Sequence, residues 1–503
     1  MNKKDVLAAA TVANLFLARS WNELLNQSDD FLRKALPTRG MLVATLCLAL
    51  LTGLILAARS IISRNPTVEK WLWWTPWLLL LAPLNRWRQQ FQPLFGSWPP
   101  NIVFAAILLV AVAATVLGKR VRVETAIRTF ALLISPLLVL TFAQAFLLPL
   151  VTSRRPTTPA TMPSEGRTPM RSRVVLIVFD ELDRVRAFSE RPANLQLEHF
   201  DALQKQSIYG ENAISPEEET TRSIPSYLLN RRISKVDPLA FGKITGIDEA
   251  TGKPVDIAKS PNLFSKVFAA GGRSAVVGWF LPYCRIFAGS TYCHWEMSAG
   301  KAIEEYQPVA TLMLQNFAKA TGDLPFAKRL SLTAFGDARI NRVDQNAHRS
   351  SYEAILERAT SIVANPDFDL VYLHIPVPHF PVIIDRTGKW IDYDSDDYYA
   401  NLVLADRALG ELQSVLESSR MWEKTNVIVV GDHGFRVGPT PRKGSSAWRH
   451  VPFLLKLAGQ HERVDYSPRF DTLIIHDLAL MLLQHKSMPP AETVDWLEQH
   501  KID

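Results

Sequence analysis

Acidic and imidazole side chains follow two short apolar runs that lie far apart in the chain. Asp180 and Glu181 come directly after VVLIVF at positions 174–179, and Asp432 and His433 come directly after NVIVVG at positions 426–431. Both runs are rich in β-branched residues and too short to cross a bilayer, so we expect two buried strands. Carboxylates seldom lie at the end of a buried strand without a partner.

These four side chains together would form an oxygen-rich metal site with one nitrogen. Such a donor set suits Mn²⁺ or Zn²⁺, and it suits Ca²⁺ or Mg²⁺ if the imidazole stays outside the ligand set. The alternative is two ordinary strand ends that leave the sheet into solvent. Two further segments favour the metal site.

The first is ETTRSIPSYLL at positions 219–229, which concentrates the hydroxyls of Thr220, Thr221 and Ser223 beside a helix-like stretch. Hydroxyls ahead of a helix are often N-caps. A threonine or serine alcohol is also a weak nucleophile that a divalent cation can activate. The second is VYLHIPVPHFP at positions 371–381, a further buried strand followed by His379 in a turn between prolines. We expect that imidazole to face a site at the strand ends.

Taken together, these residues resemble the alkaline phosphatase and sulfatase superfamily, in particular its membrane-anchored branch of phosphoethanolamine transferases and lipoteichoic acid synthases. The resemblance covers residues 173–457 and rests on four motifs in the family's order: FDEL at 179–182, Thr-x-x-Ser-x-Pro at 220–225, Pro-His-x-Pro at 378–381 and Asp-His-Gly at 432–434. It implies one divalent ion held by Asp180, Glu181, Thr220, Asp432 and His433. It also implies that Thr220 is the nucleophile and that His379 contacts the transferred group or the leaving oxygen.

The chain departs from its relatives around the nucleophile. Sulfatases convert a Cys or Ser to formylglycine within Cys/Ser-x-Pro-Ser-Arg, whereas this segment has no Cys and has Tyr227 where the Arg should be. The leucines that follow the nucleophile are nearly in phase for Thr220 and out of phase for Ser223. We therefore prefer Thr220, with Thr221 and Ser223 as alternatives. The cysteines that flank the transferases' nucleophile are missing as well.

Three cations are candidates for binding the anionic substrate. Arg222 adjoins the proposed nucleophile, and a forked guanidinium suits a phosphate or sulfate. His450 and Lys443 lie after the Asp-His-Gly motif, where the family carries a late His or Lys. The alternative for each is an ordinary loop charge.

The first third of the chain has the composition of a membrane module. Residues 41–58, 102–118 and 129–151 carry no charge and are long enough to cross about 30 Å of hydrocarbon. The shorter stretch 71–84 is rich in Trp and is a fourth candidate, either as a span or as an interfacial helix. We expect about four transmembrane helices in 41–152, preceded by an interfacial segment in 1–40.

The remaining residues predict a tether and one α/β domain. Residues 153–172 are rich in Pro and have little to bury, so we expect a semi-extended linker. From residue 173 to 503, strand-like runs alternate with helical stretches such as Ala400–Ser418. This alternation predicts a mostly parallel central sheet flanked by helices, as the resemblance to alkaline phosphatase also implies.

Charge and cysteine content bear on location. The net charge of +7 and the pI near 9.2 are modest for 503 residues, and much of the excess flanks the apolar stretches. This favours attraction to anionic membrane lipids over a nucleic-acid footprint. Cys284 and Cys293 lie close together in PYCRIFAGSTYC and favour a disulfide-closed loop and an oxidising compartment; two unrelated buried thiols are the alternative. Lys and Arg counts do not decide the topology. The resemblance implies a bacterial inner-membrane protein with its catalytic domain facing the periplasm or the exterior.

The sequence therefore predicts a membrane-anchored, metal-dependent hydrolase or transferase. We expect it to act on phosphate or sulfate esters through a covalent Thr220 intermediate, and to transfer a phospho-substituent from a lipid-borne donor to an envelope lipid or glycan. The alternatives are a sulfatase or phosphodiesterase that hydrolyses small esters, and a catalytically inactive relative that binds envelope components. Donor, acceptor, metal identity and oligomeric state stay open.

Overall fold

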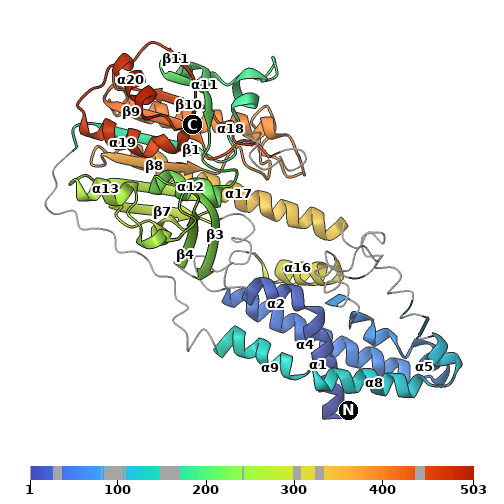
Figure 1. The fold of residues 1–503 in the computed structure, drawn as a ribbon. Coiled ribbons are helices and arrows are strands. Elements are labelled where there is room, and N and C mark those ends of the chain that lie inside the picture. Colours follow the sequence, from blue (N-terminus) through green and yellow to red (C-terminus); the bar gives the residue numbers. More distant parts are fainter. Residues whose placement is uncertain are drawn as a thin grey trace. The chain divides into compact units, whose positions relative to one another are not determined.

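A computed structural model describes residues 2–25, 37–80, 82–83, 106, 109–110, 112–147, 170–240, 243–297, 307–322, 324, 334–436 and 448–502. The chain divides into two compact units (Figure 1). A helical unit contains residues 1–29, 36–154 and 303–341, and a sheet unit contains residues 30–35, 155–302 and 342–503. The predicted tether at 153–169 lies outside the described residues.

The helical unit is built around α1 and α4. Its elements are α1 (Lys3–Phe16), α2 (Ala18–Leu25), α4 (Thr38–Ser63), α5 (Pro66–Leu72), η1 (Thr75–Leu80), α8 (Arg120–Leu133), α9 (Pro136–Phe142), η2 (Ala143–Leu147) and α16 (Val309–Gly322). The segment expected to be interfacial forms α1 and α2, and α1 packs against α4, α8 and α9. Asn14 of α1 donates to Thr141 Oγ1 of α9 across 3.2 Å.

Two helices among the described residues are long and apolar enough to cross a membrane. They are Thr38–Ser63 and the continuous stretch Val121–Leu147, with mean hydropathies of 2.5 and 2.1. About four were expected. The stretch 71–84 is not one continuous helix, because α5 ends at Leu72 and a turn separates it from η1. Much of the stretch 102–118 lies outside the described residues.

The sheet unit has a central sheet of eight strands, ordered β11-β2-β10-β9-β1-β8-β6-β7. The strands are β1 (Arg173–Phe179), β2 (Ile208–Ile214), β6 (Ser274–Trp279), β7 (Tyr292–Glu296), β8 (Leu370–Ile375), β9 (Thr425–Gly431), β10 (Phe453–Lys456) and β11 (Val464–Asp471). Only β10 is antiparallel to its neighbours. The prediction of a mostly parallel sheet flanked by helices is confirmed.

Strand β1 lies between β8 and β9, and the three strands end together. Phe179 is in register with Ile375 of β8 and with Gly431 of β9. All the residues of these strands are buried, which explains why their sequences are continuous apolar runs. The residues that come after each strand are therefore brought to one edge of the sheet.

Alternate residues of β1 pack against two different sets of helices (Figure 1). Val174, Leu176 and Val178 contact the side that carries α12 (Thr220–Leu229), α13 (Leu263–Ala269) and α19 (Ile475–Gln484). Val175, Ile177 and Phe179 face α11 (Glu198–Gln204), α17 (Ala334–Val363) and α18 (Tyr398–Ser418). This alternation is the two-residue period of a strand with both faces covered.

Smaller elements complete the sheet unit. They are η3 (Val185–Ser189), a second sheet of β3 (Ile233–Ala240), β4 (Lys243–Asp248) and β5 (Pro254–Asp256), then η4 (Ile257–Lys259), α14 (Tyr283–Ile286), η6 (Trp422–Lys424), η7 (Thr472–Ile474) and α20 (Pro490–His500). Cys284 of α14 and Cys293 of β7 form a disulfide, as the loop between them suggested. The third cysteine, Cys47, is buried in α4 as a free thiol.

Candidate active site and metal centre

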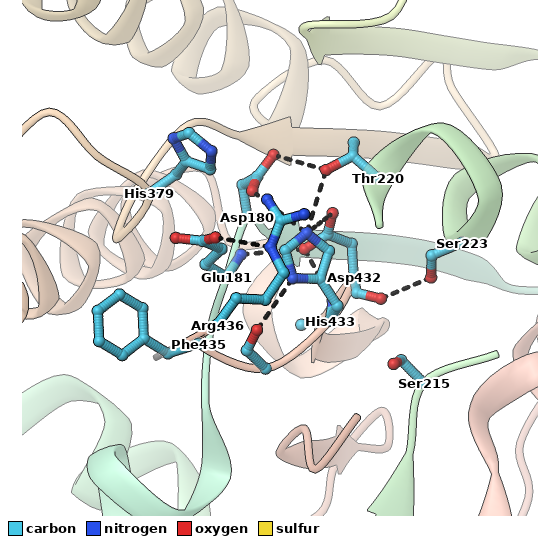
Figure 2. A network of polar contacts seen from close by, with 12 residues as sticks. Asp180, Glu181, Ser215, Thr220, Ser223, His379, Asp432, His433, Phe435 and Arg436 are labelled. Atoms are coloured by element: carbon cyan, nitrogen blue, oxygen red, sulfur yellow. Dashed lines mark hydrogen bonds and ion pairs between the residues drawn. The ribbon is translucent and has the colours of Figure 1, made fainter. Parts of the chain in front are cut away.

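The candidate site lies where β1, β8 and β9 end (Figure 2). Asp180 directly follows β1, and its backbone N–H donates to Ile375 O at the end of β8, at 3.0 Å. Asp432 directly follows β9, and its N–H donates to Phe179 O at 3.3 Å. The ladder thus continues one residue beyond each strand and fixes both acids side by side. Thr220 reaches the same place as the first residue of α12.

The donor atoms of four side chains face one another at distances of 3.3 to 4.0 Å. Thr220 Oγ1 lies 3.3 Å from Asp180 Oδ2 and 3.3 Å from His433 Nε2. His433 Nε2 lies 3.5 Å from Asp432 Oδ2 and 4.0 Å from Asp180 Oδ1. Around a tetrahedral ion with bonds near 2.05 Å, neighbouring ligand atoms are about 3.4 Å apart. The spacing is that of a ligand set around a single cation.

The hydrogen bonds at the site leave several of these donor atoms available to bind a cation. Asp180 Oδ1 and Asp432 Oδ2 are buried and have no hydrogen-bond partner among the described residues. His433 Nδ1 lies 3.0 Å from Gly434 O, and a carbonyl only accepts, so Nδ1 carries the proton and Nε2 presents its lone pair to the site. Asp180, Asp432 and His433 offer ligand atoms that all lie within 4.8 Å of one another. These residues therefore fit a divalent metal ion.

The two carboxylates experience opposite electrostatic effects. Burial acts to raise the pKa of Asp180, but the surrounding imidazoles, His379 foremost, outweigh it and hold that pKa below its usual value. Burial and the neighbouring Asp180 charge raise the pKa of Asp432. Two ionised carboxylates therefore repel each other at this site, and a cation bound between them would offset that repulsion.

His374 of β8 belongs to the same site and was not predicted. Its Nε2 lies 3.4 Å from Asp180 Oδ2 and has no hydrogen-bond partner among the described residues. Its Nδ1 lies 3.1 Å from Trp279 O and 2.8 Å from the Tyr283 hydroxyl, so Nδ1 carries the proton and the ring is held in one orientation. The signal was a fully buried position inside an apolar strand, where an imidazole needs a polar partner.

Glu181 lies outside the group of metal donors, although the sequence predicts it as a ligand. The backbone takes a positive φ of 62° at this residue, and its N–H donates to Asp432 Oδ1 at 3.0 Å. Its carboxylate accepts from Arg436 Nε at 3.3 Å (Figure 2). The sharp turn after Asp180 therefore directs the Glu181 carboxylate toward the Arg436 guanidinium. Arg436, which the sequence analysis did not single out, is about one-third exposed beside the site.

His379 lies beside the donors in the proline-rich turn after β8. Burial acts to lower its pKa, but the charges of Asp180 and Glu181 outweigh it, and the pKa is raised. The turn is held by Asn401, whose side chain donates to His379 O at 2.9 Å and to Pro381 O at 3.0 Å. The imidazole lies at the strand ends, as the sequence predicts. Its raised pKa favours the protonated ring in the metal-free protein.

The structure separates the three candidate nucleophiles. Thr220 alone among them contacts Asp180 and His433 in the described residues. The Ser223 hydroxyl donates to the backbone carbonyl of Asp432, which ties α12 to the end of β9. The geometry therefore favours Thr220 over Ser223, and nothing places Thr221 in the cluster.

Arg222 and His450, two of the three predicted substrate-binding cations, have contacts with other groups in the described residues. Arg222 pairs with Glu217 at 3.2 Å and donates to Ser234 O at 3.2 Å. His450 lies on the loop before β10, where its backbone carbonyl accepts from Arg184 N at 3.2 Å, and burial lowers its pKa. Lys443 lies outside the described residues. Arg436 is the guanidinium that the structure places at the site.

One family of known proteins matches part of this chain. Residues 242–470 match the family of type I phosphodiesterases and nucleotide pyrophosphatases. Over these residues the match supports the predicted resemblance to phosphate- and sulfate-ester enzymes. The matched stretch includes His374, His379, Asp432 and His433, and it begins after Asp180 and Thr220. The comparison with curated proteins finds no match to this chain.

Several solved structures are similar to the chain at low sequence identity. Murine ectonucleotide pyrophosphatase / phosphodiesterase 5 is 12% identical, with a TM-score of 0.38 over 63% of this chain and 96% of that one. A protein in the alkaline phosphatase superfamily from Vibrio parahaemolyticus is 13% identical, with a TM-score of 0.38 over 65% and 71%. A 2-O GAG sulfatase is 12% identical, with a TM-score of 0.39 over 64% and 72%.

Proposed function

We propose that this chain is a membrane-anchored, metal-dependent enzyme that cleaves a phosphoric ester through a covalent Thr220 intermediate. One observation carries the proposal: the Thr220 hydroxyl lies 3.3 Å from both Asp180 and His433, within a buried set of metal donors. A hydroxyl that only capped a helix N-terminus would not need a carboxylate and an imidazole 3.3 Å away. The match of residues 242–470 to phosphodiesterases supports phosphorus as the reacting centre.

The reaction proceeds in two displacements. Asp180, Asp432, His433 and Thr220 would hold a divalent ion, whose positive charge would lower the pKa of the Thr220 hydroxyl and offset the charge of the ester. Thr220 loses its proton to solvent, and its oxygen bonds to phosphorus while the bond from phosphorus to the leaving oxygen breaks. In the second displacement an incoming hydroxyl oxygen bonds to phosphorus while the bond from phosphorus to Thr220 Oγ1 breaks. The incoming oxygen gives its proton to the His379 ring, which lost one in the first displacement, and the Thr220 oxygen takes a proton from solvent.

His379 and Arg436 serve the groups around phosphorus. His379 lies beside the donors, where its ring can donate a proton to the leaving oxygen as that oxygen takes the electron pair. Arg436 is partly exposed beside Glu181 and can bind a non-bridging phosphoryl oxygen by a charged hydrogen bond. In this proposal Glu181 holds the guanidinium in place and is not a metal ligand.

The helical unit supports a lipid-borne donor and transfer to an envelope lipid or glycan. Two of its helices are apolar enough to span a bilayer, and confinement of enzyme and donor to one surface raises their effective concentration. The disulfide between Cys284 and Cys293 supports a sheet unit that faces an oxidising compartment, such as the bacterial periplasm or cell exterior.

The test compares Thr220→Ala with the adjacent Thr221→Ala as its matched control. Full-length protein with stoichiometric Zn²⁺ or Mn²⁺ is assayed with bis(p-nitrophenyl) phosphate, and the peptide containing Thr220 is searched by mass spectrometry for a phosphoryl adduct after rapid quenching. We expect Thr220→Ala to lose activity by at least about a thousandfold and to lose the adduct. Thr221→Ala should keep both. An adduct on another residue, or full activity without Thr220, would refute the proposed nucleophile.

A hydrolase acting on small esters is the second candidate, favoured by the phosphodiesterase match. Turnover in water enriched in ¹⁸O, with and without bacterial lipids, separates the two. Hydrolysis places ¹⁸O in every product phosphate, whereas transfer produces an unlabelled phospholipid or glycan adduct. p-Nitrophenyl sulfate in the same assay tests sulfuric esters. A protein that binds no stoichiometric metal and turns over none of these esters would be an inactive binding relative.

A further inference from the structure

Helix α16 lies within the sequence of the sheet domain but packs with the helical unit. It follows β7 and precedes β8 in the chain, and it contacts α4 and α2. Lys319 of α16 pairs with Glu23 of α2, with Nζ and Oε2 2.5 Å apart. The whole segment Ile303–Asn341 belongs to the helical unit. The chain therefore leaves the sheet after β7, joins the helices and returns.

Helix α16 buries two amide side chains beside the apolar Leu312 and Ala320, and it exposes apolar side chains. Gln315 and Asn316 are among its buried residues, and Asn316 Nδ2 donates to Leu312 O at 3.0 Å. Leu314 is 50% exposed, and Ala310, less than half a helical turn away around the axis, is exposed too. A helix in water buries its apolar side and exposes its polar side.

Helix α4, the more apolar of the two candidate spans, also exposes apolar side chains, although it buries Leu48, Leu51 and Ile55 as well. Gly40 and Thr52 are buried, and Thr52 Oγ1 donates to Leu48 O at 2.7 Å. Its exposed side carries a leucine every fourth residue: Leu42, Leu46, Leu50 and Leu54. A helix that is apolar on its exposed side as well as its buried side fits a surrounding of lipid, where the solvent is as apolar as the side chains.

We propose that α16 is a membrane-embedded helix, and that its Ala310–Leu314 side contacts the acyl chains of the bilayer. The proposal rests on the membrane anchoring in the proposed function. Fourteen residues extend about 21 Å, short of the hydrocarbon thickness of about 30 Å, so α16 enters the bilayer from one side without crossing it. The pairing of Lys319 with Glu23 neutralises the charge at its C-terminal end.

This placement gives the catalytic domain a second attachment to the membrane. The Pro-rich stretch before β1 is one connection, and the excursion through α16 is another, inserted between two strands of the central sheet. A single semi-extended tether leaves a domain free to swing, whereas a second attachment restricts its movement.

The test measures the surroundings of α16 with nitroxide spin labels in the full-length chain. Leu314→Cys and Ala310→Cys are made separately in a Cys47→Ala background, which leaves only the disulfide-bonded cysteines, and are reconstituted in vesicles of phosphatidylethanolamine and phosphatidylglycerol. Accessibility of each label to oxygen, which concentrates in lipid, is divided by accessibility to a water-soluble nickel chelate. Leu50→Cys on α4 is the lipid control, and Tyr393→Cys, exposed in the sheet unit, is the water control.

Labels at positions 314 and 310 are expected to give an oxygen-to-nickel ratio at least fivefold above that at position 393 and close to that at position 50. A ratio at both α16 positions equal to that at 393, with 50 remaining lipid-like, would overturn the embedding of α16 and leave membrane anchoring intact. A water-like ratio at position 50 as well would overturn the anchoring itself. The two α16 positions guard against one label disturbing the local fold.

Discussion

Replacing Asp432 with Asn is expected to have opposite effects on stability with and without a divalent ion. The carboxylates of Asp180 and Asp432 have oxygens within 4.8 Å of each other in a fully buried site. At that distance two negative charges repel by about 3 kcal/mol with an effective dielectric constant of 20. Without metal, the Asn variant removes this repulsion. With metal, it removes a charged ligand.

The backbone contacts of the side chain survive the substitution. Asp432 Oδ1 accepts from Glu181 N at 3.0 Å and from His433 N at 2.9 Å, and the Asn carbonyl oxygen can accept both. The amide nitrogen then takes the place of Oδ2, the atom that has no hydrogen-bond partner among the described residues. The effect of the variant should therefore be electrostatic and leave the loop in place.

The pH dependence of the effect has a defined sign. Burial and the charge of Asp180 raise the pKa of Asp432 in the folded, metal-free protein. A group with a raised folded pKa favours folding below its unfolded pKa of about 3.8, and that contribution is lost as pH rises through the folded pKa. The advantage of Asp432→Asn in chelator should therefore be small at acidic pH and grow toward pH 8.

The assay is thermal unfolding of the full-length protein in chelator and in saturating Zn²⁺ or Mn²⁺. At pH 8 in chelator, Asp432→Asn should raise the unfolding temperature by about 3 to 6 °C, whereas with metal it should lower both that temperature and, by at least about a hundredfold, the metal affinity. Asp406→Asn in α18 is the control, since Asp406 is also buried but accepts from Phe200 N and His199 N away from the donors. An Asp432→Asn effect of the same sign in both conditions, as expected for Asp406→Asn, would refute the shared cation site.

Three further substitutions test other parts of the structure. His374→Ala should weaken metal affinity or kcat by about 10- to 100-fold, because its imidazole contacts Asp180 at 3.4 Å; unchanged metal titrations and kinetics would contradict that role. Arg436→Ala should raise KM for an anionic ester by about tenfold or more, with Arg436→Lys intermediate, as steady-state kinetics would show. Burial and the charge of Lys266 lower the pKa of His476 to about 4, so the wild type should lose about 3 kcal/mol of stability as pH falls from 6.5 to 4, and His476→Gln should not show this part of the loss in unfolding curves.

The sheet and most of the donors were predictable because their signals are local and strong. The runs that form β1, β8 and β9 are continuously apolar, and each ends abruptly at a polar residue or at a Pro-rich turn. Parallel strands that end together bring their next residues to one edge of the sheet, so Asp180 and Asp432 had to be close once the strands were adjacent. Thr220 needed the family resemblance, because a hydroxyl before a helix is usually only a cap.

The errors arise where the direction of a side chain depends on tertiary contacts. No sequence pattern predicts the positive φ of Glu181 or its pairing with Arg436. Asp180 and Glu181 therefore looked equally suitable as metal ligands. Arg222 adjoins the nucleophile in sequence, but on a helix the next side chains point in other directions, and Glu217 was close enough to pair with it. His374 was hidden because a histidine inside a strand is more often structural.

The position of α16 could not be predicted for a related reason. Its sequence, VATLMLQNFAKATG, has the composition of an ordinary helix that packs on a sheet, and it lies between two strands of that sheet. Which unit it joins depends on whether Gln315 and Asn316 face inward, and hydrophobic periodicity alone assigns the apolar side to the core. Only the partner helices α2 and α4 reverse that assignment.

Helix α12 links the proposed nucleophile to the loop that would bind the metal ion. Its first residue is Thr220, and two later residues bind the backbone at the end of β9: Ser223 donates to Asp432 O, and the Tyr227 hydroxyl donates to Gly431 O at 2.9 Å. The strand that supplies the metal donors Asp432 and His433 is therefore also the strand that fixes the helix carrying the hydroxyl. Any shift of β9 against β1 would move ligand and nucleophile together. The distance between Thr220 and His433 is thus less sensitive to strand movement than the distance of either residue from Asp180. The assembled site therefore depends most on the register between β1 and β9.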